Sequence, residues 1–271
     1  MCLIVFSWQP EAEYPLALAA NRDEFYRRPT RPVHFWEDHS DIIGGRDLEA
    51  GGTWMAFNRD GRFAAVTNYR EVPPPRGKFS RGKLISDYLK NSLAAREYLA
   101  SVAAVIEDSP DDWSGFNLLA GDSSGLYYYS NRSDSIQSLD PGLYGLSNRL
   151  LDTPWPKLQK AKQDLQALLD SHNYAAPERI VSIMHNPTQY PDDQLPDTGV
   201  EMKTERLLSS CFIASPDYGT RNTSALVLHS SGKLLWHEQL YETEGTKGEF
   251  MQFELALPID LAAKFSEAST L

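Results

Sequence analysis

Met1-Cys2-Leu3-Ile4-Val5-Phe6-Ser7-Trp8 opens the chain, and Tyr14-Pro15-Leu16-Ala17-Leu18-Ala19-Ala20 follows after a few residues. The first stretch contains a short apolar run, which is typical of a buried β-strand. The second could be helix or strand by itself, but Pro15 near its start and the short separation favour a β-hairpin with the first. We therefore predict paired strands over residues 2–8 and 14–20.

The rest of the chain alternates between blocks of strands and blocks of helices. Strict β-α-β alternation is absent, which disfavours a doubly wound parallel sheet. We predict an α+β fold with two mainly antiparallel sheets, for which a four-layer αββα sandwich is one arrangement. Further strands are expected at 54–57, 62–67, 116–120, 126–129, 143–146, 209–214, 223–229, 234–241 and 249–255. Helices are expected at 82–93, 94–107, 153–169 and 177–184, and a long loop at 186–204.

The composition is that of an ordinary globular protein. The 271 residues suffice for one large core, so we expect a single domain over 1–271. A net charge of −11 argues against nucleic acid as a partner, because such binding needs a basic surface. Two cysteines exclude a disulfide scaffold, and no apolar run is long enough to span a bilayer. Without a basic segment before the first apolar run, we expect no signal peptide and a cytoplasmic protein.

Motifs for metals and common cofactors are absent. The chain has no GxGxxG, P-loop, GxSxG, HExxH or paired CxxC, and its six His residues are scattered. We therefore expect no metal site and no required cofactor. Two basic groups stand out, one at 22–28 and one formed by Arg76, Lys78, Arg81 and Lys83. The second is interpreted as a solvated face, although it could hold an anionic group of a ligand.

Cys2 directly follows the initiator Met, and its small side chain permits removal of Met1. The mature chain would then carry a thiol and a free α-amine on one residue. An α-amine has a pKa of about 7.7–8.0, so it can accept the thiol proton near neutral pH. The competing interpretation is that Cys2 is a small apolar residue in a buried strand.

The segment Asn21-Arg22-Asp23-Glu24 changes abruptly from apolar to polar after the second strand. If strand alternation continues, Asn21 and Asp23 share one face and Arg22 and Glu24 share the other. One of these pairs could face the first strand and Cys2. A solvated turn that happens to be charged is the alternative.

These segments resemble the NRDE family, the family of the transport and Golgi organisation protein 2. The resemblance rests on the opening strand and Asn21-Arg22-Asp23-Glu24, and it continues through the whole chain in order. The other matching segments are Gly51-Gly52-Thr53-Trp54, Thr67-Asn68-Tyr69, Gly115-Phe116-Asn117-Leu118, Tyr144-Gly145-Leu146-Ser147-Asn148, Thr153-Pro154-Trp155 and Tyr218-Gly219-Thr220-Arg221.

The resemblance implies an N-terminal-nucleophile-like αββα fold and, more distantly, similarity to cysteine acylases. The acylase positions would be Cys2 as nucleophile, Arg22 and Arg221 as cations, Asp23 beside the α-amine, and Asn68 and Asn148 as oxyanion donors. Asn21, Glu24 and Trp54 would contribute to binding. One departure is that Arg22 and Asp23 are adjacent here, so both can serve Cys2 only if the strand bends.

Two functions are compatible with this sequence. The first is a cysteine amidase or acylase acting on a small acyl or amide compound. The second is a non-catalytic binding or carrier protein for haem, acyl-CoA or lipid ligands, because the family is linked to haem mobilisation, lipid metabolism and Golgi organisation. No His stands out as an axial haem ligand, so haem enters only as a possible ligand. A purely structural module would leave the polar residues near Cys2 without a role.

Overall fold

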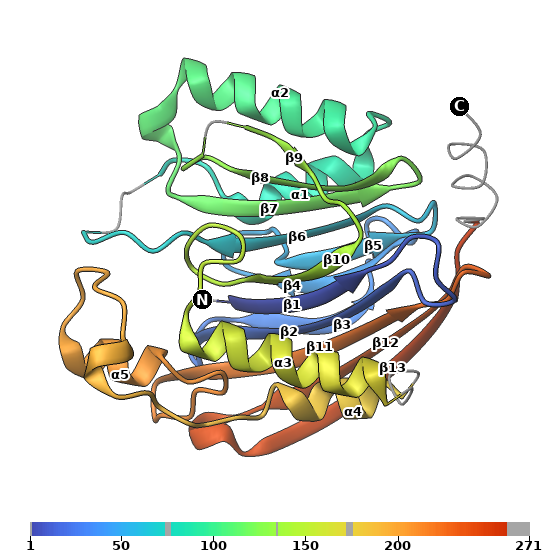
Figure 1. Cartoon of the computed structure of the whole chain (residues 1–271). Coiled ribbons are helices and arrows are strands. Elements are labelled where there is room, and N and C mark those ends of the chain that lie inside the picture. The colour runs from blue at the N-terminus through green and yellow to red at the C-terminus, as the bar shows by residue number, and fades with distance from the viewer. Residues whose placement is uncertain (1, 74–76, 134, 172–175, 259–271) are drawn as a thin grey trace.

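A computed structural model describes residues 2–73, 77–133, 135–171 and 176–258 of the chain (Figure 1). Two antiparallel sheets face each other, and helices cover the outer face of each sheet. The predicted α+β class and the four-layer αββα arrangement are therefore confirmed.

The first sheet has six strands and contains the beginning and the end of the described chain. Its order is β10 (Gly142–Leu146), β1 (Cys2–Trp8), β2 (Leu16–Phe25), β11 (Tyr218–Leu228), β12 (Lys233–Tyr241) and β13 (Lys247–Ala256). The second sheet has seven strands from the intervening sequence. Its order is β3 (Thr30–Phe35), β4 (Ile42–Asp47), β5 (Met55–Asn58), β6 (Phe63–Asn68), β7 (Phe116–Asp122), β8 (Gly125–Ser130) and β9 (Gln137–Ser138).

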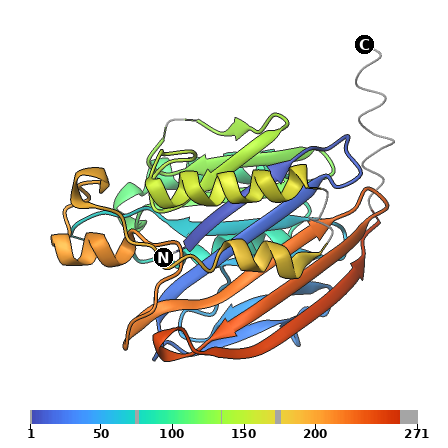
Figure 2. The ribbon, with the colours of Figure 1, turned by 60° about the horizontal axis from the view of Figure 1, so that its bottom comes forward.

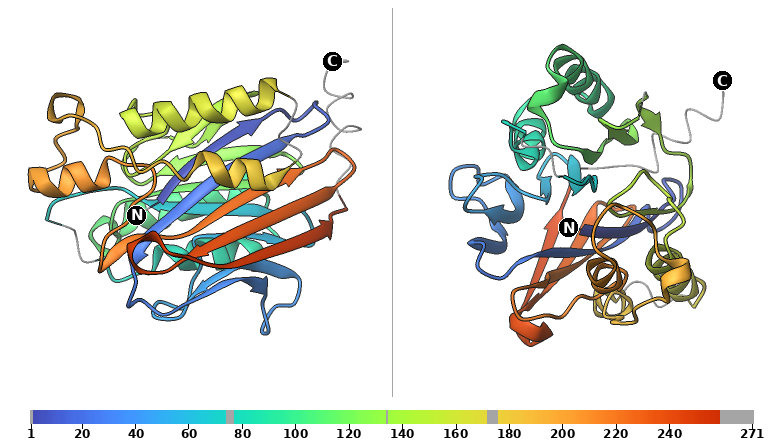
Figure 3. Two further views of the ribbon diagram at one scale, coloured as in Figure 1. Left: turned by 90° about the horizontal axis from the view of Figure 1, so that it is seen from below. Right: turned by 90° about the vertical axis from the view of Figure 1, so that its left-hand side faces the viewer.

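Each sheet has its own pair of covering helices, which Figures 2 and 3 show from other sides. Helices α1 (Arg81–Lys90) and α2 (Ala95–Asp108) pack on the seven-stranded sheet, and α3 (Pro156–Asp170) and α4 (Pro177–Ile183) pack on the six-stranded sheet. The short helix α5 (Met202–Leu208) lies beside the end of the sandwich at which β1 begins. The remaining helical turns are η1 (Pro110–Asp112), η2 (Asp192–Gln194) and η3 (Thr243–Gly245).

Three apolar layers hold the sandwich together, and β1 contributes to two of them. Ile4 and Phe6 point into the layer between the sheets, whereas Leu3 and Val5 point to the layer under α3 and α4. Because both faces of β1 are buried, its sequence is apolar without alternation. This explains why a continuous apolar run marks the first strand.

The strand predicted at 209–214 is wrong. Helix α5 ends at Leu208, and the segment that follows is irregular although it is mostly buried. Side chains and neighbouring loops satisfy its backbone: Asn21 donates to the Cys211 carbonyl, and the Ile213 N–H donates to Thr220 Oγ1. An apolar run therefore marks burial here but not regular structure. The predicted loop at 186–204 also contains η2 and the start of α5.

Strands β3 and β4 were not predicted. β3 contains Pro32 and polar residues, which argue against a central strand, but β3 forms the edge of its sheet, where Pro is tolerated. β2 is also longer than predicted, because it continues through Asn21-Arg22-Asp23-Glu24 to Phe25. The polar segment is therefore part of the sheet and not a turn after it.

A buried carboxyl group links the two sheets. Glu238 of β12 accepts a 2.8 Å hydrogen bond from the Val33 N–H of β3, and it also accepts bonds from Ser224 and Asn222 of β11. Burial raises the pKa of Glu238 to about 7, while the bonds from Val33 and Ser224 oppose that shift. The folded protein therefore binds this proton more tightly than the unfolded chain does.

A second structural constraint is the close approach of Gly52 to Gly82. A Cβ atom on Gly52 would lie 2.5 Å from the carbonyl carbon of Gly82, which is backbone and cannot rotate away. The Thr53 N–H donates to the Gly82 carbonyl at 3.2 Å across the same contact. These glycines allow the segment before β5 to pack against the first turn of α1.

We predict that Glu238 makes stability depend on pH. Its contribution should be complete below the unfolded pKa of about 4.3 and lost as the pH rises through about 7, because the folded state holds the proton more tightly. Glu238→Gln stays neutral and should flatten the plot of unfolding free energy against pH over that range, measured by urea denaturation. Glu254→Gln on the exposed strand β13 is the control. An unchanged slope in Glu238→Gln would contradict the assignment.

We also predict that Gly52→Ala lowers the free energy of unfolding by about 1–3 kcal/mol, because the added methyl group must displace backbone. Gly248→Ala is the matched control, since its Cβ would meet no atom closer than 3.5 Å. Urea denaturation of both variants tests the difference. Equal stability of the two would show that the contact between Gly52 and Gly82 relaxes at no cost.

Candidate functional site around Cys2

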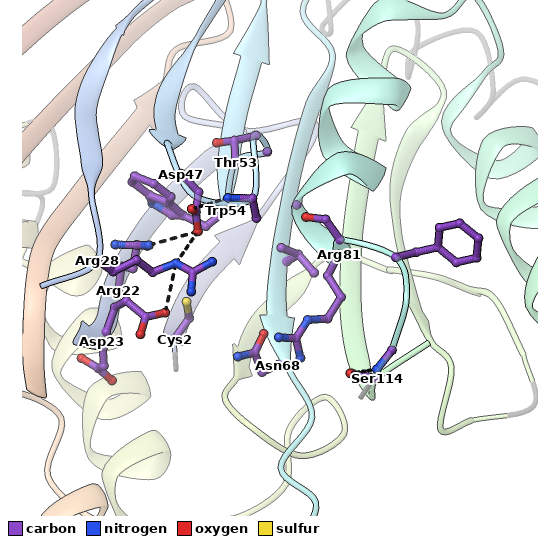
Figure 4. Close-up of a pocket in the computed structure, with 18 of the residues that line it drawn as sticks. Cys2, Arg22, Asp23, Arg28, Asp47, Thr53, Trp54, Asn68, Arg81 and Ser114 are labelled. Carbon is purple, nitrogen blue, oxygen red and sulfur yellow. Dashed lines mark hydrogen bonds and ion pairs between the residues drawn. The ribbon is translucent and has the colours of Figure 1, made fainter. Parts of the chain in front are cut away.

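A cavity of about 360 Å³ opens at the end of the sandwich where β1 begins. Its walls are the polar ends of β1, β2, β4 and β6 and the first turn of α1 (Figure 4). Of the residues proposed from the sequence, six line it: Cys2, Arg22, Asp23, Glu24, Trp54 and Asn68. The structure thus brings together residues from four separate parts of the sequence.

The pairing of β1 with β2 determines how Cys2 meets the polar segment. Cys2 lies directly opposite Arg22 in the antiparallel register, so both side chains project from the same face of the sheet. Asp23 is one residue further along β2, beyond the first residue of β1. The nitrogen of Cys2 therefore lies at the end of the strand toward Asp23, while its thiol shares the face of Arg22. Arg22 and Asp23 can serve the two ends of Cys2 without a bend in the strand.

Arg22 is only 5% exposed, yet its charge is well compensated. Its guanidinium lies 4.2 Å above the Trp54 ring, 3.7 Å from the Asp47 carboxylate and 3.4 Å from Thr30 Oγ1. These contacts hold the cation in a fixed position on the side of the cavity that carries the thiol.

Asp47 joins Arg22 to a second arginine. Arg28 Nε donates to Asp47 Oδ2 at 2.7 Å, and the Glu49 and Ala50 N–H groups donate to the other carboxylate oxygen. Although burial acts in the opposite direction, these bonds lower the pKa of Asp47. Arg28 also lies 3.9 Å from the Glu24 carboxylate. Asp47 and Glu24 thus offset the two arginines on this wall.

Asp23 faces the opposite side of β2 from Arg22. Its carboxylate accepts a 2.8 Å hydrogen bond from Thr220 Oγ1, and it lies in the electrostatic field of the buried Lys157 from α3. Burial raises the pKa of Asp23, whereas Lys157 and Thr220 oppose the rise. Burial lowers the pKa of Lys157 to about 8, and its Nζ donates to the Leu208 carbonyl at 2.7 Å.

The Cys2 thiol is half-buried. Burial raises its pKa, Asp23 and Glu24 add to the rise, and Arg22 opposes it. Thiolate formation at this site therefore needs a base close to the sulfur. The predicted removal of Met1 concerns a residue outside the described ranges.

Comparison with known proteins places the chain in a family. The model of the family described as Transport and Golgi organisation 2 matches residues 1–243. The chain belongs to this family.

Named relatives agree with this assignment over nearly their full length. The Transport and Golgi organization protein 2 homolog of Bos taurus is 32% identical over 95% of this chain and 99% of its own. The Homo sapiens homolog is 34% identical over 88% of this chain and 92% of its own. Among solved structures, the Caenorhabditis elegans N-acylethanolamine-hydrolyzing acid amidase (NAAA) ortholog gives a TM-score of 0.49 at 10% identity, over 83% of this chain and 92% of that chain.

Three of the proposed site residues do not line the cavity: Asn21, Asn148 and Arg221. Asn21 is buried on the helix side of β2, where its Nδ2 donates to the Met184 and Cys211 carbonyls and its Oδ1 accepts from Thr223. Asn148 is also buried, and its Nδ2 donates to the Asn68 carbonyl at 2.9 Å. The structure therefore assigns both amides to holding the backbone near the cavity and does not place them at its surface.

Arg221 is displaced by a β-bulge. The register of β11 on β2 shifts between Thr220 and Asn222, which leaves Arg221 as the extra residue. Its guanidinium donates to the Phe25 and Arg28 carbonyls at 2.9 and 3.1 Å and lines a separate cavity of about 290 Å³. The expected convergence of Arg221 and Asn148 on the cleft of Cys2 is therefore not found.

Several residues of this site have no specific role predicted from their local sequence. Arg28, Asp47, Lys157 and Arg81 all lie at or under the cavity. Arg28 and Arg81 had been noted only as parts of basic groups, and no local signal distinguishes them from surface residues. Their roles depend on strand and helix ends that are distant in the sequence.

No metal site is found among the residues that the structure describes, since no three His, Cys, Asp or Glu residues cluster suitably. Within the same ranges, no helix has the length and apolar character needed to cross a membrane. The side chains that line the cavity supply a thiol, carboxylates, an amide, hydroxyl groups, arginines and a lysine.

We predict different effects for the two asparagines. Asn148→Ala should lower the free energy of unfolding by about 1–3 kcal/mol, because it removes a buried amide and leaves the partly buried Asn68 carbonyl without this donor. Asn68→Ala, at the surface of the cavity, should change stability less while altering ligand binding or turnover. Urea denaturation of both variants provides the comparison. A larger loss of stability in Asn68→Ala would reverse these assignments.

Proposed function

We propose that the cavity is the active site of an amidase-type enzyme that uses Cys2 as an N-terminal nucleophile on a small acyl or amide compound. The single observation that carries this proposal is the position of Cys2. Its thiol shares the face of the buried Arg22, its nitrogen lies at the end of β1 on the side of Asp23, and the residue lines a cavity of about 360 Å³. An enzyme of this type requires both groups on one residue.

Removal of Met1 would first free the α-amine of Cys2, once per protein molecule. Each catalytic cycle would then start from this mature N-terminus. The neutral amine takes the thiol proton, and the thiolate attacks the carbonyl carbon of the substrate. The resulting oxyanion would accept a hydrogen bond from the Asn68 side chain. The C–N bond then breaks as the α-ammonium gives its proton to the leaving nitrogen, and a thioester remains on Cys2.

Hydrolysis of the thioester completes the cycle. The α-amine removes a proton from water, the water oxygen attacks the thioester carbonyl, and the C–S bond breaks. The carboxylic acid leaves and the thiol regains its proton. Asp23 would stabilise the α-ammonium in both halves of the reaction, and Arg22 would lower the energy of the thiolate.

A carrier function for an acyl-CoA, lipid or haem ligand is the second candidate. The observation that favours it is the burial of the Cys2 thiol, which raises its pKa and makes it a poor nucleophile if the α-amine is not freed. The cavity would then bind a ligand without turnover. The state of the N-terminus therefore separates the two functions.

We predict that the mature protein lacks Met1 and that its Cys2 reacts rapidly with iodoacetamide near neutral pH, because the free amine can accept the thiol proton. Intact mass spectrometry of the untagged protein gives the N-terminus, and labelling rates across pH give the apparent pKa of the thiol. Cys211 serves as the internal reference, since burial raises the pKa of its thiol to about 12 and should keep it slow.

The matched control is a chain with an N-terminal extension that keeps Cys2 but has no free amine there. Its labelling should fall to the rate of an ordinary buried thiol, and Cys2→Ser should lose labelling and any acyl adduct while remaining folded. Retention of Met1, or equal rates with and without the extension, would reject the nucleophile mechanism and favour the carrier.

A further inference from the structure

The cations around the cavity differ in how their charge is neutralised. Arg22 and Arg28 share Asp47, and Arg28 also pairs with Glu49. Lys78 is largely exposed and lies 2.6 Å from Asp112. Each of these side chains therefore has a carboxylate partner within the protein.

Arg81 is the exception among the cations that line the cavity. Its guanidinium donates to the Gly115 carbonyl at 3.3 Å, and no carboxylate of the described residues lies within ion-pair distance. The side chain is half-buried at the cavity, and Figure 4 shows it directed toward Asn68. Burial lowers the pKa of Arg81, and the neighbouring Arg28 adds to this shift, whereas Cys2, Glu24 and Glu71 oppose it from beyond ion-pair distance.

The position of Arg81 in α1 adds to its positive field. It is the first residue of a ten-residue helix, and the first turn of that helix contains no acidic residue. The positive end of the helix dipole is therefore not offset from within the helix. The close contact of Gly52 with Gly82 fixes this helix end against the cavity.

The acidic groups that line the cavity belong to the other wall. Asp23, Glu24 and Asp47 come from β2 and β4, whereas Arg81 comes from α1. Asp47 and Glu24 already offset Arg22 and Arg28 on the first wall, so an anionic group of a ligand would be attracted mainly to the second wall. This polarity would orient such a ligand with its anionic group at α1 and its remaining part toward Cys2.

We propose that Arg81 binds an anionic group of the ligand, a carboxylate or a phosphate, and so selects acyl compounds that carry a negative charge. This inference rests on the proposed function, in that the acyl group would be presented to Cys2. Arg81 would thus determine the specificity for negatively charged acyl compounds. The anchoring interaction would be a charge-assisted hydrogen bond in a site from which water is partly excluded.

The test compares alkylation of Cys2 by iodoacetate and by iodoacetamide, which differ in charge but are similar in size. The ratio of the two rates should favour iodoacetate more than it does for a free thiol. Arg81→Gln should lower that ratio about tenfold or more, because hydrogen bonds to charged groups are among the stronger ones. The rate with iodoacetamide is the reference, because any general effect of Arg81 on the reactivity of the Cys2 thiol acts on both reagents and cancels in the ratio. Lys83→Gln makes the same charge change on the same helix, but Lys83 is exposed and outside the cavity, so it should keep the ratio.

This design separates the two proposals. A slow reaction with both reagents rejects the activated nucleophile but leaves anion binding measurable by thermal unfolding of Cys2→Ser. In that protein, inorganic phosphate or a short-chain carboxylate should raise the Tm, and the rise should disappear in the double variant with Arg81→Gln. Whichever anion acts at the lower concentration identifies the chemistry. A folded Arg81→Gln protein with an unchanged rate ratio and unchanged Tm shifts would overturn the assignment.

Discussion

The register of β1 on β2 is the constraint on which the rest of the site depends. Backbone hydrogen bonds along seven residue pairs, from Trp8 opposite Leu16 to Cys2 opposite Arg22, determine where the chain begins relative to the polar segment. A slip by one residue would move every side chain of β1 to the other face. The burial of both faces of β1 in two apolar layers opposes such a slip. Cys2 is therefore held beside Arg22 and Asp23 by the core of the sandwich.

The family motif performs two separate tasks because β2 is a strand through its polar part. Its alternation sends Arg22 and Glu24 to one side and Asn21 and Asp23 to the other. Asn21 stabilises the irregular segment around Cys211, Asp23 meets Thr220, and Arg22 stacks on Trp54. Four consecutive polar residues would be costly to bury in a sheet without these partners. The motif is thus part of the scaffold as well as of the cavity.

Charge is distributed unevenly around the cavity. On the β2 and β4 wall, the arginines and carboxylates neutralise each other and stay fixed, which prepares a rigid surface beside the thiol. On the α1 wall, Arg81 donates to the Gly115 carbonyl and has no ion-pair partner among the described residues, although Glu24 and Glu71 contribute a favourable field. The electrostatic potential therefore differs between the two walls of the cavity, with one wall nearly neutral and the other cationic. Such a difference can orient a ligand so that one end faces Cys2.

Much of the fold could be predicted from the sequence. Apolar runs marked β1 and the last strands, the strands expected at 54–57 and 62–67 correspond to β5 and β6, and the helices expected at 153–169 and 177–184 correspond to α3 and α4. These signals are local, because each depends on a few neighbouring residues. β3 escaped prediction because an edge strand accepts Pro32. The strand predicted after Leu208 was wrong because an apolar run can be buried without forming a strand.

The sequence by itself also determined the family, through several motifs in one order, and it indicated Cys2 and Arg22-Asp23 as neighbours. Only the tertiary structure decided which motif residues reach the cavity. A bulge redirects Arg221, and a hydrogen bond to the Asn68 carbonyl retains Asn148 in the interior. The packing of Gly52 on Gly82 brings Arg81 to the cavity from a distant segment. The physical reason is that strand registers and helix contacts depend on long-range packing, to which no local pattern of residues corresponds.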